Sequence, residues 1–308
     1  MAKKRLLLLL LQRDYNLFTK LKLLNNSKAK KNFKGITFII IAALCFSIMS
    51  AFIKLIIDQH HVLDIMFLRS IFALTILLTL YKFKFFEVKK KYFKFHFFRT
   101  ILGVSAMFFT FTALKYIPIS NLTIINFSKI FFILPLAVIL LKEKTYFSSI
   151  FYILIGFLGV IIIIGIEVDY LSNLKYYFFA LFGAFLIALV KILIKKLATF
   201  ENTLNIQFWF ALYSCMFLFF PYFHVAIFPS PKSILHIFFA SIFGLLAQFF
   251  TIKGLQTAKS TIVMPFDFFR VIFATIIGVF IFSESITLFF LFGALLIIYS
   301  GIQLSKLT

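Results

Sequence analysis

Hydrophobic residues occur along the chain in runs of roughly 20, separated by short polar breaks. A helix needs about 20 apolar residues to cross the hydrocarbon core of a bilayer. Apolar residues make up 63% of the 308 positions, well above the share found in a soluble domain. The pattern therefore predicts an all-α membrane protein with ten transmembrane helices. The predicted spans are 35–57, 62–80, 96–114, 121–141, 147–166, 176–190, 204–220, 233–252, 260–282 and 286–304.

One long stretch of the chain occurs twice. The region from Phe97 to Glu143 recurs 141 residues later as the region from Phe238 to Glu284, without an insertion. FFRTILGVSAMFFTFTAL in the first copy aligns with FFASIFGLLAQFFTIKGL in the second, with nine identities in eighteen positions. Five of the nine are residues other than Phe, so the abundance of Phe does not explain the match. The chain is therefore predicted to consist of two repeats.

The two repeats are expected to have opposite orientations in the membrane. Each repeat contains five predicted spans, and an odd number places the start of the second repeat on the other side of the bilayer. Inverted repeats are the architecture of many secondary transporters, in which the substrate site lies near the midplane between the repeats. The predicted organisation is a basic cytoplasmic tail at 1–34, a first repeat at 35–166 and a second repeat at 167–308.

Basic residues predict the orientation. With the N-terminus in the cytoplasm, all but seven of the 32 Lys and Arg fall on the cytoplasmic side, including the connection 82–99; three lie in outer loops and four within spans. Short cytoplasmic loops carry an excess of Lys and Arg. We therefore expect a multi-pass inner-membrane protein with both termini cytoplasmic. The net charge of +22 is attributed to topology and to attraction by the lipid bilayer, and not to nucleic-acid binding, because no soluble basic domain is present.

Two cations are predicted deep within the membrane. Lys129 lies about nine residues into the fourth span and Arg270 about ten into the ninth, roughly 13 Å or more from the ends where these spans start. A charge at that depth costs roughly 3 kcal/mol, so we expect both cations to face a substrate cavity. In the alternative interpretation, Asp267 neutralises Arg270 one turn away, whereas Asn126 at the equivalent position brings no charge to Lys129. The candidate substrate-binding residues are Lys129, Arg270, Asp267, Asn126 and Arg69.

Four charged residues remain to be interpreted. Arg69 and Lys54 each allow a structural and a functional interpretation, whereas Glu143 and Glu284 are interpreted as structural. Arg69, about seven residues into the second span, either extends outward to the interface or serves function. Lys54 either pairs with Asp58, four residues further on, or acts as a gate charge at the outer mouth. Glu143 and its copy Glu284 follow the fourth and ninth spans and are interpreted as structural turn residues that favour the N-terminus of the next helix.

These residues together resemble the drug/metabolite transporter superfamily, in its EamA-type branch with two repeats of five helices. The resemblance covers about 35–303. It is carried by the Arg69 segment, by RTILGVSAMFFTFTALKYIPIS, by LLKEK and by the second copy ending in FRVIFATIIGVFIFSES. It implies a ten-helix inner-membrane carrier with a central cavity. Members of this family handle substrates as different as amino acids, nucleotide derivatives, vitamins and S-adenosylmethionine, so the resemblance does not define the substrate.

The charges predict the class of substrate. Four basic residues against one acid, Asp267, give the spans a positive interior, which favours a carboxylate or a phosphate. The related small multidrug carriers have a carboxylate in their first helix, and residues 35–57 contain none. We expect a secondary transporter of a small anionic or zwitterionic metabolite, such as an amino acid or a compound like S-adenosylmethionine. A metabolite or drug exporter of the same family and a non-transporting multipass protein are the alternatives.

Other activities have no support in the sequence. The chain lacks the phosphate-binding loop of an ATP-driven motor. The spans hold no clustered nucleophile, base and acid and no set of metal ligands, and the polar loop DQHHVLD is interpreted as a loop and not as a metal site. We therefore expect no enzyme activity, no cofactor and no metal. Asp267 is the only acidic residue deep within a span, and it is the hypothetical proton carrier if transport is coupled to protons.

Overall fold

The computed structural model describes residues 30–81, 92–142, 148–165, 174–225 and 229–307. This part of the chain is helical almost throughout and contains no strand. Residues 1–29 of the predicted tail, Glu143 and the predicted boundary between the repeats lie outside the described part. Residues 30–34 were expected in the tail, but the first helix already begins at Lys30.

The helices of the two halves follow the same order along the chain. The first half contains the first helix (Lys30–Lys54), α2 (Val62–Tyr81), α3 (Phe93–Tyr116), α4 (Ile119–Phe127), α5 (Lys129–Leu141) and α6 (Ser148–Gly165). The second half contains α7 (Leu174–Leu197), α8 (Thr203–Val225), α9 (Pro231–Thr257), α10 (Ser260–Val263), the 3-10 helix η3 (Met264–Phe268), α11 (Phe269–Phe282) and α12 (Leu288–Leu307). A shift of 141 residues brings each helix start of the first half to within three residues of a helix start in the second half.

The described helices fit a membrane protein. Eight of them are long and apolar enough to cross a membrane, counting α4 with α5 and η3 with α11 as single helices. The spans predicted at 147–166 and 286–304 are present as shorter apolar helices, Ser148–Ile163 and Leu288–Gln303. The prediction of an all-α membrane protein is confirmed.

The duplication extends to the detail of the backbone. Lys142 at the end of α5 has φ 54°, and Ser283 at the end of α11 has φ 52°. These are the two non-glycine residues with positive φ in the described part, and they are 141 positions apart. Side chains disfavour this left-handed conformation. Its recurrence at equivalent positions shows that the two halves share the same helix termination.

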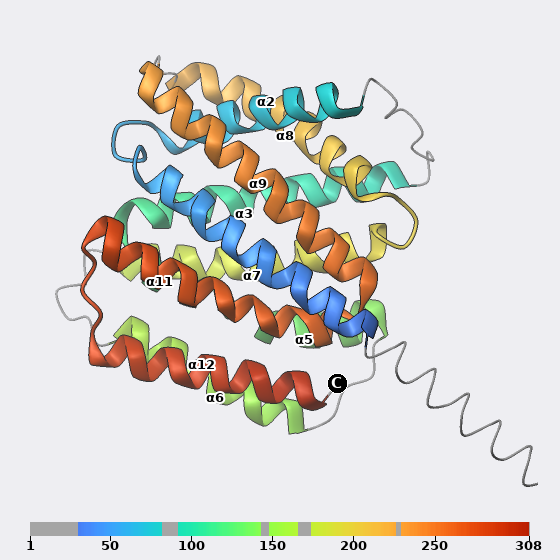
Figure 1. Ribbon diagram of the computed structural model, residues 1–308, viewed down its shortest axis with the longest axis vertical. Coiled ribbons are helices and arrows are strands. Elements are labelled where there is room, and N and C mark those ends of the chain that lie inside the picture. The colour runs from blue at the N-terminus through green and yellow to red at the C-terminus, as the bar shows by residue number, and fades with distance from the viewer. Residues whose placement is uncertain (1–29, 82–91, 143–147, 166–173, 226–228, 308) are drawn as a thin grey trace, which may run out of the picture.

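Equivalent helices of the two halves pack against each other in opposite directions. α6 and α12 lie side by side in Figure 1. Near the start of α6, the Tyr152 carbonyl accepts a hydrogen bond from Ser300, late in α12, whereas further along α6 Gly159 lies against Gly293, early in α12. The two helices therefore run antiparallel. The close approach depends on glycine, because a Cβ atom at Gly159 would lie 2.7 Å from the Gly293 carbonyl oxygen.

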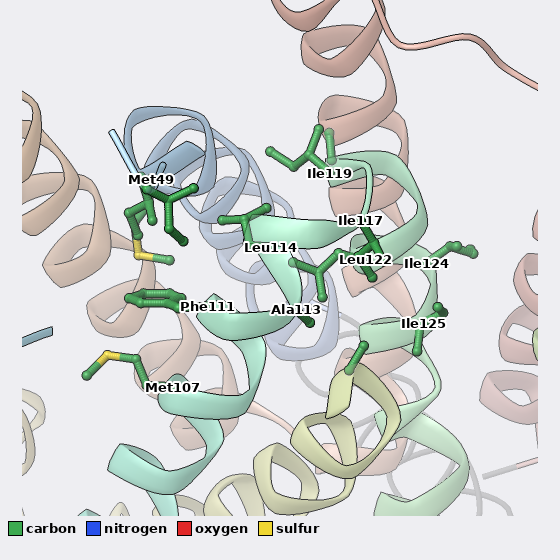
Figure 2. Close-up of a cluster of buried hydrophobic side chains, with 14 of the residues drawn as sticks. Met49, Met107, Phe111, Ala113, Leu114, Ile117, Ile119, Leu122, Ile124 and Ile125 are labelled. Atoms are coloured by element: carbon green, nitrogen blue, oxygen red, sulfur yellow. The ribbon is translucent and has the colours of Figure 1, made fainter. Parts of the chain in front are cut away.

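A buried apolar cluster forms one wall of the interior where α3 approaches the first helix. Met49 of the first helix and Met107 of α3 lie on either side of the Phe111 ring in Figure 2. The cluster continues through Leu114 and Ile117 into the turn that leads to α4. This packing holds α3 and the first helix together beside the polar interior described next.

Candidate functional site

A cavity of about 130 Å³ lies between the first helix and α2, α3, α5, α7, α8, α9, η3 and α11. This volume is room for roughly ten water molecules. Its charged lining consists of five basic side chains and one carboxylate. These residues are Arg69, Arg99, Lys129, Lys191, Asp267 and Arg270.

The two halves contribute equivalent positions to the cavity wall. Several lining residues form pairs that are 141 positions apart. These pairs are Phe46 with Ile187, Met49 with Val190, Arg69 with Phe210, Met107 with Gln248, Thr110 with Thr251 and Lys129 with Arg270. The cavity therefore lies where the two repeats face each other.

Lys129 and Asp267 form an ion pair that joins the two halves. Lys129 begins α5 directly after the break at Ser128, and Asp267 lies in η3, directly before α11. Both side chains are buried, and the Lys129 ammonium donates to Asp267 Oδ2. In the alternative interpretation Asp267 neutralised Arg270, but in the structure the ion-pair partner of Asp267 is Lys129. Spacing along the chain does not decide the partner of Asp267, because Lys129 reaches it from the other half.

Arg270 and Lys191 flank the aromatic ring of Phe46. The Arg270 guanidinium carbon lies 4.8 Å and the Lys191 ammonium 5.5 Å from the ring centroid. Arg270 also directs Nη2 toward Ser50 Oγ at 3.4 Å. Neither cation is within 4.0 Å of a carboxylate in the described part of the chain. A cation is attracted to an aromatic face, but the ring supplies no countercharge.

Arg69 turns inward and does not extend to the membrane surface. Its side chain is buried, and its guanidinium contacts the sulfur atoms of Met49 and Met107. The guanidinium carbon lies 5.6 Å from the centroid of Phe111. Space for this group comes from Gly244, since a Cβ atom there would lie 2.6 Å from Arg69 Nη1. The outward interpretation does not fit this geometry, and the functional role of Arg69 remains a prediction.

Arg99 is a lining residue that our sequence analysis placed in a cytoplasmic connection. Its side chain is 1% exposed, donates to Gln248 Oε1 at 2.9 Å and stacks on Phe210 at 3.8 Å. The preceding basic residues obscured its position. The helical spacing of Arg99, Gly103 and Thr110 along one face of α3 is the signal that would have identified it.

Lys191 was also missed, because we expected the sixth span to end at Val190. In the structure α7 continues to Leu197, so Lys191 lies well inside the helix and is 8% exposed. Ile187 and Ile194, one turn before and after Lys191, line the same cavity. This spacing predicts the shared face once the longer helix is assumed.

Asn126 does not reach the cavity. It is 1% exposed, it is not part of the cavity lining, and its side-chain amide has no hydrogen-bond partner in the described structure. Asn126 belongs to α4, whereas its equivalent Asp267 belongs to η3. The two repeats differ in helix type at this point, which explains why only one of the pair faces the cavity.

Lys54 pairs with Glu284, and not with Asp58 as one interpretation had it. The Lys54 ammonium lies 2.7 Å from Glu284 Oε1. The helix ends at Lys54 and turns follow at 55–59, so a spacing of four residues does not place Asp58 on the same face. Glu284 also accepts from the Ile119 backbone N–H at 2.7 Å and from Ser120 Oγ at 2.5 Å. Glu284 therefore caps the N-terminus of α4, a helix of the other repeat, and not that of the helix that follows it.

The environment of Glu284 stabilises its charged form. Burial raises the pKa of the Glu284 carboxyl, but the hydrogen bonds from Lys54, Ser120 and the Ile119 N–H lower it by more. The resulting pKa lies below the ordinary value for glutamate. Lys54 lies outside the cavity lining, so the predicted gate role remains a prediction.

The fold and the site define a helical membrane protein with a basic internal cavity between two repeats. The sequence profile of the EamA-like transporter family matches residues 33–165 and 174–304. The chain therefore belongs to the EamA-like transporter family, and the resemblance to drug/metabolite transporters is confirmed.

Known relatives cover nearly the same length. An uncharacterized transporter from Helicobacter pylori (strain ATCC 700392 / 26695) is 28% identical over 88% of this chain and 94% of its own. An S-adenosylmethionine uptake transporter from Rickettsia felis is 24% identical over 89% of this chain and 92% of its own. Solute carrier family 35 member G1 of Mus musculus is 25% identical over 86% of this chain and 76% of its own. A crystal structure with 14% identity has a similar fold, with a TM-score of 0.58 over 90% of this chain and 95% of its own.

Proposed function

We propose that this protein is a secondary transporter that moves a small anionic or zwitterionic organic metabolite across the inner membrane by alternating access. The observation that carries the proposal is the cavity at the repeat interface, with five basic side chains and one carboxylate in its lining. Such a lining favours a substrate that bears a carboxylate or a phosphate. A binding site between two repeats is also the usual arrangement in carriers of this kind.

The proposed architecture has ten membrane helices in two inverted repeats. The antiparallel packing of α6 against its equivalent α12 supports this, because equivalent helices of inverted repeats run in opposite directions. α2 and its equivalent α8 support it too. Phe67, early in α2, stacks on Tyr222, late in α8, whereas Leu77, late in α2, packs with Phe208, early in α8. In the proposed mechanism, the two repeats exchange conformations so that the cavity opens to each side in turn.

The name of the Rickettsia felis relative suggests one substrate for comparison. S-adenosylmethionine has a carboxylate that the basic lining can bind, but its ammonium and sulfonium groups would meet the same cations. In the described part of the chain, the one acidic group of the lining is Asp267, which is engaged by Lys129. The charges therefore favour an anion or an amino-acid-like zwitterion over a compound with a net positive charge.

The test is a comparison of metabolite uptake and efflux in cells that produce the wild-type protein, cells without it and cells with Lys129→Ala combined with Asp267→Ala. This double variant removes the ion pair without leaving an unpaired buried charge. We expect at least one anionic or zwitterionic metabolite to change level with the wild type alone. Identical profiles in all three strains, with both proteins present in the membrane, would contradict the proposal.

A further inference from the structure

Buried polar contacts join the two halves where α3 begins. His96, in the first turn of α3, lies with Nε2 2.8 Å from Oε2 of Glu201, which belongs to the segment 198–202 between α7 and α8. Both side chains are at most 6% exposed. Tyr92, directly before α3, stacks on Phe200 of the same segment, with ring centroids 4.8 Å apart. The start of α3 is thereby held against the α7–α8 connection of the other half.

Gln256, at the end of α9, binds the same connection. Its side-chain nitrogen donates to the backbone carbonyl of Glu201 at 3.2 Å, and its side-chain oxygen accepts from Thr203 Oγ1 at 3.1 Å. His96, Glu201 and Gln256 thus form one group, the His96 cluster, which connects α3, the α7–α8 connection and α9.

The His96 cluster lies directly beyond one end of the cavity. Arg99 lines the cavity and follows His96 by three residues on α3, a rise of about 4.5 Å. Thr251 lines the cavity and precedes Gln256 by five residues on α9, a rise of about 7.5 Å. Substrate leaving the cavity along α3 and α9 in this direction therefore meets the His96 cluster.

The opposite end of the cavity is closed by other contacts. There Ile53 of the first helix and Leu114 of α3 are buried beyond the lining, and the ion pair of Lys54 with Glu284 joins the two halves. The repeat does not reproduce the His96 cluster at this end. The positions equivalent to its members are Ile237, His60 and Lys115.

The hydrogen bonding of the His96 cluster is incomplete. His96 Nδ1 and Glu201 Oε1 are buried without a hydrogen-bond partner in the described structure. Each such group carries a desolvation cost that offsets part of the gain from the bond between Nε2 and Oε2. Water can hydrate these groups once this end opens, so the closed and open states differ little in free energy. Such a contact suits a gate that opens in every transport cycle.

We infer that the His96 cluster is the gate at this end of the cavity, and that its contacts between α3, the α7–α8 connection and α9 break when the cavity opens there. This inference deepens the proposed alternating access and rests on it. The ion pair of Lys54 with Glu284 stays closed in that state, so the cavity is not open to both sides at once. The distribution of basic residues predicts that the His96 cluster faces the cytoplasm.

Cysteine labelling from each side of the membrane tests the gate without a substrate. Cys45 and Cys215 are replaced by Ala, and Thr251→Cys then places a reporter thiol in the cavity lining. A charged, membrane-impermeant maleimide is added to inside-out vesicles, which expose the cytoplasmic face, or to right-side-out vesicles. We expect Glu201→Ala to raise the labelling rate about tenfold or more in inside-out vesicles, and to leave it unchanged in right-side-out vesicles.

A second variant and two controls accompany Glu201→Ala. Gln256→Ala breaks the His96 cluster from α9 and is expected to have the same effect, so the test does not depend on one variant folding. Thr199→Ala is the matched control, because this exposed hydroxyl lies in the same connection and donates to the Lys196 carbonyl. Glu284→Gln weakens the opposite end. Neither control should raise labelling in inside-out vesicles, and melting temperatures verify that each variant is folded.

The inference is overturned if Glu201→Ala and Gln256→Ala leave the labelling rate unchanged, if they raise it from both sides, or if the controls raise it equally. Each of these results leaves the proposed transport function standing, because that function is judged by the metabolite profiles of cells. One-sided labelling as expected, together with unchanged metabolite profiles, would instead retain the gate and contradict transport.

Discussion

Lys54 and Lys195 occupy equivalent positions of the two repeats and make the same contact. The Lys54 ammonium lies 3.5 Å from the carbonyl oxygen of Ile117, the residue that ends α3, and Lys195 donates to the carbonyl of Ala258, which ends α9, at 2.7 Å. Ile117 and Ala258 are again 141 positions apart. Each lysine therefore holds the end of a helix of its own repeat, and Lys54 additionally binds Glu284 of the other repeat.

The first prediction concerns the stability provided by Glu284. Its pKa is lower in the folded protein than in the unfolded chain, so its ionised form contributes stability that is present above the unfolded pKa, near 4.3, and is lost as the pH falls through the folded pKa. Glu284→Gln should therefore lower the free energy of unfolding by about 1–3 kcal/mol at pH 7, and by progressively less below about pH 4. Thermal unfolding of purified protein across this pH range measures the difference.

Asp58→Asn is the matched control for Glu284→Gln. Asp58 is an exposed carboxylate close to Lys54 in sequence, and it is not its ion-pair partner. We expect its substitution to change the melting temperature little at any pH. An equal loss of stability in both variants would show that Glu284 is not the specific stabilising partner of Lys54.

The second prediction concerns the glycine beside Arg69. Gly244→Ala places a Cβ atom 2.6 Å from Arg69 Nη1 and 3.0 Å from the sulfur of Met49, so the guanidinium must move. Because the end of a flexible side chain can shift, we expect little loss of stability but about a tenfold weaker apparent substrate affinity. Transport assays measure the KM for the substrate, and thermal unfolding measures the stability.

Gly254→Ala on the same helix separates affinity from packing. A Cβ atom there would meet Ile39 at 2.9 Å, away from the cavity lining. This variant should lower stability by about 1–3 kcal/mol through overpacking and leave the KM unchanged. If Gly254→Ala changes the KM as strongly as Gly244→Ala, the effect of Gly244→Ala is not specific to Arg69.

The sequence allowed the helical class and the duplication to be predicted, because apolar run length and a constant offset are properties of the chain alone. The same offset identified Lys129 and Arg270 as related positions, and both line the cavity. Depth within a span also identified Arg69. These features depend on position along a helix, which a single sequence records directly.

Pairing across the two repeats was not predictable in the same way. Sequence spacing suggested partners for Lys54 and Asp267 three or four residues away, but their partners are 230 and 138 residues distant. Turns after Lys54 interrupt the regular helix that its spacing assumes, and Asp267 pairs with Lys129 of the other half although Arg270 lies three residues away. Arg99 was missed for a different reason, because the basic residues that precede it led to its assignment to a cytoplasmic connection.

The third prediction concerns the ion pair of Lys129. Lys129→Ala leaves the Asp267 carboxylate buried without its partner, so it should destabilise the protein by about 3–5 kcal/mol. Adding Asp267→Ala should restore much of this stability. Transport should be absent in both the single and the double variant, because both lack the Lys129 cation of the lining. Lys129→Arg keeps the charge with another geometry and should retain part of the transport. A Lys129→Ala protein as stable as the wild type would contradict a buried ion pair.

The last prediction concerns competition between substrate and Asp267 for Lys129. An anion entering the cavity can take the Lys129 ammonium only by displacing the Asp267 carboxylate, which then loses its countercharge and can bind a proton. Asp267→Asn removes the competitor and one negative charge from the lining. We expect this variant to bind the anionic substrate about tenfold more tightly and to exchange it across the membrane, but to lose accumulation driven by a pH gradient.

Uptake into proteoliposomes distinguishes these effects. Net accumulation under an imposed pH gradient and exchange without a gradient are compared in the wild type, in Asp267→Asn and in Asp267→Glu, which keeps the charge and the titratable group. Loss of accumulation in Asp267→Asn with exchange retained, and recovery of accumulation in Asp267→Glu, would identify Asp267 as the group that links substrate binding to protonation. Accumulation that persists in Asp267→Asn would exclude it as the proton carrier, and unchanged affinity would show that Lys129 does not bind the substrate anion.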